Sequence, residues 1–203
     1  GVVTQTGSIV SSAKVALSDK SPSAVVETIA VAVAQAVESG PGAPIVACGV
    51  GTAAQLQADS GQVLVAPNLG WRDVPFGELL AKRLARTVRV VNDLNAAAWG
   101  ECQAGAAKGD RDVYVVFVGS GVGSAIISRG QLVTGATGLA GELGHIKVAP
   151  GGRPCGCGER GCLEAYVGGQ NLIEQMREAL AGEEPTAMRE QVQKDSALLK
   201  PAT

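Results

Sequence analysis

Aromatic residues and excess positive charge are both scarce in this chain of 203 residues. Trp, Tyr and Phe together make up 3% of the sequence, which argues against the stacking surfaces that bind single-stranded nucleic acid. The 17 Lys and Arg residues are outnumbered by 19 Asp and Glu residues, for a net charge of −2. A nucleic-acid-binding domain would need a basic surface instead. We therefore expect no nucleic-acid partner.

Long apolar runs are also missing. The longest candidate, Ala24–Val37, is interrupted by polar residues and falls short of the ~18 apolar residues that cross a bilayer. The chain does not open on a secretory leader pattern, and cysteines with metal-like spacing fit a reducing compartment. The two cysteines outside that spacing, Cys48 and Cys102, are expected to be small core residues. These features predict a cytoplasmic protein without a membrane partner.

Histidine is the rarest residue type in the chain, which contains one, His145. Three of the five cysteines, Cys155, Cys157 and Cys162, follow it within 18 residues. Thiolates with one imidazole suit a tetrahedral Zn²⁺, and four protein ligands leave no open position for activating water. The glycines between them permit tight turns. The cluster therefore predicts a structural zinc site, the alternative being unrelated buried thiols and a core histidine.

The hydrophobic pattern predicts strands alternating with helices. After an extended start over 1–17, Ser21-Pro22 signals a helix start and Gly40-Pro41-Gly42 its end. We expect strands at 45–50 (buried on both faces), 62–66, 88–91, 113–118, 125–127 and 146–148, and helices at 22–37, 75–85, 95–101 and within 163–181. The tail from about 183 is polar, with an end expected to be loose. This alternation indicates an α/β fold.

Two segments follow strands in positions that suit ligand binding. Asp93, preceded by Asn92, comes just after strand 88–91, where α/β proteins often bind ligands; it could be a general base or a helix N-cap. The loop Gly119–Ser124 joins two strands, so it fails the context test for a dinucleotide fingerprint. Its backbone N–H groups and two serine hydroxyls could hold phosphate, although the residues alone favour a hairpin turn.

Three further polar residues could bind a sugar, since ionised acceptors make strong hydrogen bonds to hydroxyls. Glu142 and Glu164 lie on either side of the proposed zinc site. Glu142 is equally a solvated surface acid, and Glu164 a first-turn acid favoured by the helix dipole. Asn68 precedes Leu-Gly, which is often turn chemistry. The residues alone leave both interpretations open.

Five segments together resemble the ROK family of bacterial-type sugar kinases and their non-catalytic repressor relatives. They are PNLGW (67–71), VVNDLNAAAWGE (90–101), VGSGVGSAI (118–126), GELGH (141–145) and CGCGERGCLEAY (155–166), in the family's order. The resemblance covers most of residues 44–168. It implies the actin-like, ribonuclease H-like fold of a two-domain sugar kinase, here truncated. Residues 1–110 would form the smaller domain, and 111–203 part of the larger domain with the zinc module.

The resemblance also implies an activity, which we expect to be that of a hexose kinase. The foremost expectation is an ATP-dependent glucokinase acting on the sugar 6-hydroxyl, with Mg²⁺ accompanying ATP. The alternatives are a sugar-sensing repressor domain and a kinase for N-acetylmannosamine, N-acetylglucosamine, mannose or fructose. Polyphosphate could replace ATP as the donor. The family's opening DxGGT-type phosphate loop and its C-terminal half do not occur here, so these 203 residues alone should not be an efficient kinase.

Residue roles follow from the same resemblance. Asp93 would be the catalytic base. The sugar ligands would be Asn68, Asn92, Asp93, Glu142, His145 and Glu164. The nucleotide phosphates would contact Gly119, Ser120, Gly121 and Gly123, with serine at 120 where threonine is usual. The zinc ligands would be His145, Cys155, Cys157 and Cys162, so that His145 binds zinc with one nitrogen and sugar with the other. The complete protein would be a homodimer.

Overall fold

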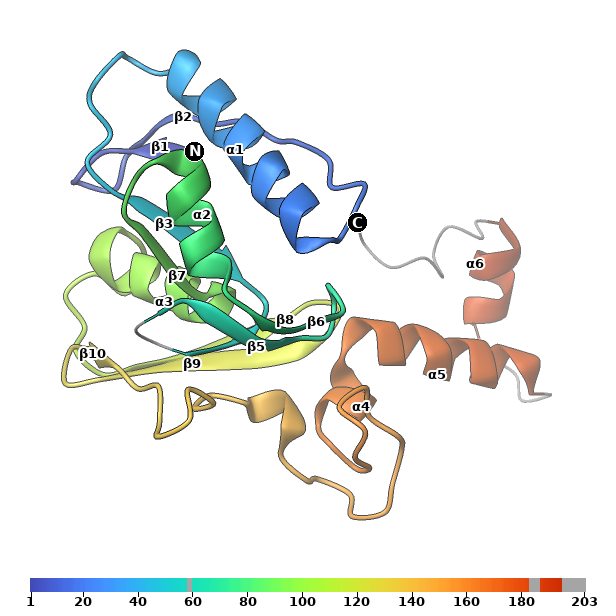
Figure 1. The fold of residues 1–203 in the computed structure, drawn as a ribbon. Helices are drawn as coiled ribbons and strands as arrows, with labels where there is room; N and C mark the ends of the chain where they lie inside the picture. The colour runs from blue at the N-terminus through green and yellow to red at the C-terminus, as the bar shows by residue number, and fades with distance from the viewer. Residues whose placement is uncertain (58–59, 183–186, 195–203) are drawn as a thin grey trace. The chain divides into compact units, whose positions relative to one another are not determined.

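The computed structural model describes residues 1–57, 60–182 and 187–194, and it is an α/β structure (Figure 1). Its contacts divide the chain into two compact units. Unit 1 is Gly1–Val113 with Ile126–Ala140, and unit 2 is Tyr114–Ala125 with the chain from Gly141 onward. The expected domains, 1–110 and 111–203, stay a prediction.

The described residues of unit 1 up to Asn92 form three small sheets. Strands β3 (Cys48–Thr52) and β7 (Val88–Asn92) pair in parallel, with Thr52 opposite Asn92. Strands β4 (Gln55–Gln57), β5 (Gln62–Ala66) and β6 (Trp71–Val74) form an antiparallel sheet. Strands β1 (Val2–Val3) and β2 (Ile9–Ser11) form a hairpin. Because β3 and β7 are parallel, their carboxyl ends meet at one edge, at Asn92 and the start of the next helix.

Three helices complete unit 1, and their ends match the sequence signals. Helix α1 (Pro22–Glu38) begins after Ser21, whose hydroxyl accepts the Ala24 N–H. Helix α2 (Phe76–Leu84) and helix α3 (Asp93–Ala104) follow β6 and β7. The main core packs the inner faces of α1, α2, β5 and β7, with Val25, Val26, Ala54, Val63, Ala66, Trp71, Phe76, Leu80 and Val90 buried. The predicted helices at 22–37 and 75–85 are therefore confirmed.

The predicted strand at 45–50 is wrong in its bounds and its burial. Pairing begins only at Cys48, and Val46 is 82% exposed. Among the described residues β3 pairs with β7 alone, so its apolar residues have no sheet neighbour on the other edge. An apolar groove of about 770 Å³ lies there, with lining residues that include Val33, Val37 and Val50. Cys48 and Cys102 are half-buried rather than core residues.

Strands β8 (Val113–Val118), β9 (Val122–Ser128) and β10 (Gln131–Leu132) form a further sheet in the order β10-β9-β8, in which β10 and β9 are antiparallel. Strand β9 is longer than the predicted 125–127, so only 119–121 remain as the turn. The strands β4 and β6 and the short β10 were not predicted, because two to four residues between turns carry too little periodicity.

Unit 2 carries short helices around an irregular loop. These are the 3₁₀ helix η1 (Leu143–His145), α4 (Glu164–Val167), α5 (Gly169–Ala181) and α6 (Met188–Lys194). The expected strand at 146–148 is only an isolated bridge between Lys147 and Cys162. The predicted loose end beyond 194 lies outside the described residues. Within the described ranges, no helix combines the length and apolarity that a membrane crossing needs.

Candidate functional site

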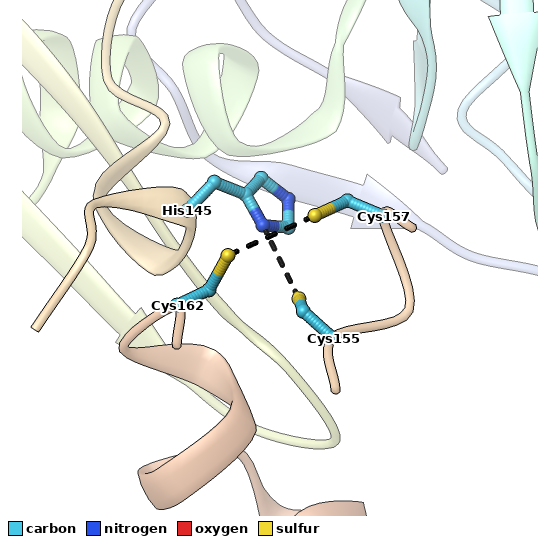
Figure 2. Close-up of side chains that lie close together, drawn as sticks. All are labelled: His145, Cys155, Cys157 and Cys162. Atoms are coloured by element: carbon cyan, nitrogen blue, oxygen red, sulfur yellow. Dashed lines mark hydrogen bonds between the residues drawn. The ribbon is translucent and has the colours of Figure 1, made fainter. Parts of the chain in front are cut away.

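Unit 2 brings together the four residues expected to bind zinc, as Figure 2 shows. Their ligand atoms, the His145 nitrogen and the sulfurs of Cys155, Cys157 and Cys162, all lie within 4.8 Å of one another. His145 Nδ1 is 3.7 Å from Cys155 Sγ, and the sulfurs of Cys157 and Cys162 are 3.8 Å apart. All three cysteines are free thiols.

These separations fit a tetrahedral metal. With Zn–S of about 2.3 Å and Zn–N of about 2.1 Å, tetrahedral corners give about 3.8 Å between sulfurs and about 3.6 Å between sulfur and nitrogen. The observed 3.8 Å and 3.7 Å agree with both values. The donor types are those that Zn²⁺ prefers, and two of the separations equal those of a tetrahedral site, while the four atoms as a set lie within 4.8 Å of one another. The cluster is therefore compatible with Zn²⁺, and its four side chains could fill all four coordination positions.

The backbone explains how residues up to 17 positions apart converge. A ladder of backbone hydrogen bonds folds the segment back on itself, including Cys155 N–H to Glu159 O at 2.8 Å and Gly161 N–H to Arg153 O at 2.8 Å. Gly161 has φ +78°, and a Cβ there would overlap the carbonyl of Ala149. Only glycine fits such a position without strain.

The surroundings of Cys155 and Cys157 shift the pKa values of their thiols in opposite directions. Burial raises the pKa of the Cys155 thiol to about 11. A backbone hydrogen bond from Glu159 lowers the pKa of the exposed Cys157. Lys147 Nζ donates a hydrogen bond to Cys162 Sγ at 3.4 Å. Sequence reasoning missed Lys147, because nothing in its spacing marks it as a partner of the cluster.

Two carboxylates lie next to this cluster. Glu142 Oε2 is 3.8 Å from His145 Nε2, the ring nitrogen that does not face Cys155. Glu164 Oε1 is 4.0 Å from Cys155 Sγ, while its other oxygen accepts the Val122 N–H at 2.8 Å. His145 thus presents one nitrogen to the sulfurs and the other to a half-exposed carboxylate.

Only some of the N–H and hydroxyl groups of the glycine loop 119–124 that were expected to hold phosphate are available to a ligand. Ser124 is buried and its hydroxyl donates to Gly141 O at 2.6 Å, so it is not available to a phosphate. The Val122 N–H is occupied by Glu164, and the Gly119 N–H by Gly121 O. In the described part of the chain, the N–H groups of Ser120 and Gly121 have no acceptor. Ser120 is exposed, so these two amides and its hydroxyl remain for a ligand.

In unit 1 the structure separates the roles of Asn92 and Asp93. Asn92 is the N-cap of α3, and its Oδ1 accepts the N–H groups of Leu94 and Asn95 at 3.0 and 3.1 Å. Asp93 is half-buried at the first helical position, with Oδ1 accepting the Leu94 N–H at 2.9 Å. The backbone of Gly51 packs against Asp93, where a Cβ would lie 3.3 Å from its Cα. The sequence allowed Asp93 as the helix N-cap, but Asn92 supplies this cap instead.

Asn68 lies in the turn between β5 and β6, and its carbonyl accepts Lys20 Nζ at 2.9 Å. The indole N–H of Trp71 donates to Lys20 O at 2.6 Å, which fixes the same turn to the segment before α1. Within the described residues no hydrogen bond links Asn68 to Asp93.

Comparisons with known proteins agree with the motifs. The sequence profile of the ROK family matches residues 1–200. The chain is 42% identical over 173 residues to a glucokinase of Streptomyces coelicolor, which covers 85% of this chain and 53% of that protein. It is 32% identical over 151 residues to a putative xylose repressor of a Caldicellulosiruptor species, covering 73% and 38%.

Among solved structures, the ROK family glucokinase of Streptomyces griseus, in complex with glucose and AMPPNP, is similar with a TM-score of 0.78 and 40% identity. That match covers 89% of this chain and 57% of the other. The chain belongs to the ROK family. The part described here has the actin-like architecture of ROK kinases, as expected from the sequence. This ROK chain spans about half the length of the curated glucokinase that it matches.

Proposed function

We propose that the protein carrying this chain is a hexose kinase, foremost an ATP-dependent glucokinase. The observation that carries the proposal is that Asn92 and Asp93 have different roles at the start of α3. Asn92 caps the helix, so Asp93 is not needed there and its carboxylate can serve chemistry. The similar Streptomyces glucokinases, one of them bound to glucose and an ATP analogue, support the same activity.

Asp93 would act as general base. Its Oδ1 is held by the Leu94 N–H, which orients the carboxylate, and Oδ2 has no hydrogen-bond donor among the described residues. In the reaction the sugar 6-hydroxyl gives its proton to Asp93 as its oxygen attacks the γ-phosphorus of ATP. The bond from that phosphorus to the bridging oxygen breaks, and ADP leaves with the electron pair. Such positioned bases contribute about 10²–10⁴-fold to turnover.

In unit 2, sugar hydroxyls would be bound by Glu142, by Nε2 of His145 and by Glu164. Asn92 and Asn68 stay predicted sugar ligands from the sequence. Carboxylates and amides suit a ring of hydroxyls because they accept and donate at several points. Zn²⁺ held by His145 and the three cysteines would supply rigidity only, since its four positions are filled. It would fix the ring plane of His145.

A nucleotide phosphate would be held by the N–H groups of Ser120 and Gly121 and by the Ser120 hydroxyl. Successive backbone amides in a turn form a concave donor site for anions. Mg²⁺ with ATP, a homodimeric assembly and a cytoplasmic location remain predictions from the sequence.

The test is a coupled assay for sugar phosphate on the complete protein, with glucose, mannose, fructose, N-acetylglucosamine and N-acetylmannosamine as acceptors. ATP and polyphosphate serve as donors. The proposal expects the highest kcat/KM with glucose and ATP. No phosphate transfer to any acceptor, despite measurable sugar binding, would refute it and favour the sugar sensor suggested by the repressor relative.

A further inference from the structure

The glycine loop 119–124 is attached to both segments that flank the metal ligands, and both attachments lie within unit 2. On the His145 side, the Ser124 N–H and hydroxyl both donate to Gly141 O, at 3.1 and 2.6 Å. Ser124 is 5% exposed, so this double hydrogen bond is shielded from water. Gly141 precedes His145 by four residues.

On the Cys162 side, three hydrogen bonds hold the same loop. Glu164, two residues after Cys162, accepts the Val122 N–H at 2.8 Å. The first two N–H groups of α5, from Gly169 and Gln170, donate to the carbonyls of Gly119 and Ser120 at 2.8 and 3.1 Å. Gly119, Ser120 and Val122 are therefore each held by the segment that follows Cys162.

The packing leaves little freedom for the loop to shift alone. A Cβ at Gly121 would overlap the Glu164 carboxylate, and a Cβ at Gly144 would overlap the carbonyl of Val122. Gly144 is the residue before His145. The backbone of Val122 is thus enclosed between a residue next to one metal ligand and a carboxylate close to another.

We propose that the zinc module shapes the phosphate-binding loop through Glu164, so that nucleotide affinity depends on the metal and on this carboxylate. The inference rests on the proposed function. The metal fixes the separation of the His145 and Cys162 segments, and those segments hold the loop from both sides. An amide bound to a carboxylate makes a stronger hydrogen bond than one bound to a neutral acceptor. Glu164 is a positioning residue for the N–H groups of Ser120 and Gly121.

The experiment measures ADP affinity by calorimetry without sugar on the complete protein, with zinc content determined on each sample. Glu164→Ala removes the acceptor and should weaken ADP binding roughly tenfold or more, the worth of a hydrogen bond to a charged group, while zinc stays at one per chain. Glu164→Gln keeps an acceptor oxygen and should restore most of the affinity. Residue-resolved amide exchange should show a faster Val122 N–H in Glu164→Ala and after zinc removal.

Glu142→Ala is the matched control, because Glu142 is also a proposed sugar ligand beside His145 but does not contact the loop. It should weaken sugar binding and leave ADP affinity unchanged. Unaltered ADP affinity and Val122 exchange in zinc-loaded Glu164→Ala would overturn the inference. A wild-type protein that binds no nucleotide at all would instead refute the proposed kinase function.

Discussion

The substitution Cys157→Ser should remove the metal without damaging the protein core. Cys157 is exposed, whereas Cys155 and Cys162 are 8% and 0% exposed. Loss of the exposed sulfur leaves no buried cavity, so the metal-free variant should differ from metal-free wild type by no more than about 0.5 kcal/mol. Any larger difference between the zinc-loaded proteins then reports the metal itself.

The size of that difference follows from mass action. Free zinc at about 1,000 times the dissociation constant stabilises the folded state by about 4.1 kcal/mol. In a protein of about 150–250 residues each kcal/mol changes Tm by roughly 2–4 °C, and in a longer protein by less, so the complete wild-type protein should lose at most about 16 °C when zinc is chelated. Cys157→Ser should show the lower Tm with and without chelator, and less than one zinc per chain.

Calorimetry and elemental analysis on the complete protein measure both quantities. Cys102→Ser is the matched control, since it makes the same chemical change in α3, far along the chain from the cluster, and should keep one zinc per chain. Full zinc content in Cys157→Ser, with an unchanged response to chelator, would refute the four-ligand site.

Three further substitutions test local features. Gly161→Ala should cost at least about 1 kcal/mol in unfolding free energy because of its positive φ, whereas Gly156→Ala, which has nothing within 4 Å of its Cβ position, should be tolerated. Hydrogen bonds from Arg153 lower the pKa of Glu178, so Glu178→Gln should destabilise the protein at pH 7. In denaturant titrations, the difference in unfolding free energy between wild type and this variant should vanish as pH falls through the lowered pKa. Asn92→Ala should lose about 0.5–2 kcal/mol of capping energy, and Asn92→Asp should retain it, as thermal unfolding would show.

The sequence correctly predicted those features that depend on residues close together in the chain. Ser21-Pro22 and the glycines after 39 bounded α1 correctly, because capping and helix termination depend on adjacent residues. The clustering of His145 with the three cysteines could be predicted because all four residues fall within one short segment. The strand at 45–50 was wrong because its burial depends on sheet neighbours that its own residues do not specify.

The contacts between distant segments could not be read from the sequence. Glu164 accepts the N–H of Val122, 42 residues away, and Ser124 donates to Gly141. Both pairings depend on how the loop returns to η1 and α4. They change the interpretation of the glycine loop, since they occupy a serine and an amide that a sequence pattern would assign to phosphate.

The measurement that tests the kinase mechanism most directly compares Asp93→Asn with wild type in the complete protein. Glucose affinity is measured by calorimetry, and turnover by direct detection of the sugar phosphate formed from ATP. The variant keeps the shape of the side chain and the helix cap of Asn92 but removes the proton acceptor. We expect unchanged glucose affinity and a turnover lower by about 10²–10⁴, with Asp110→Asn, at an exposed position, behaving as wild type. Near-normal turnover in Asp93→Asn would contradict the assignment of Asp93 as the base.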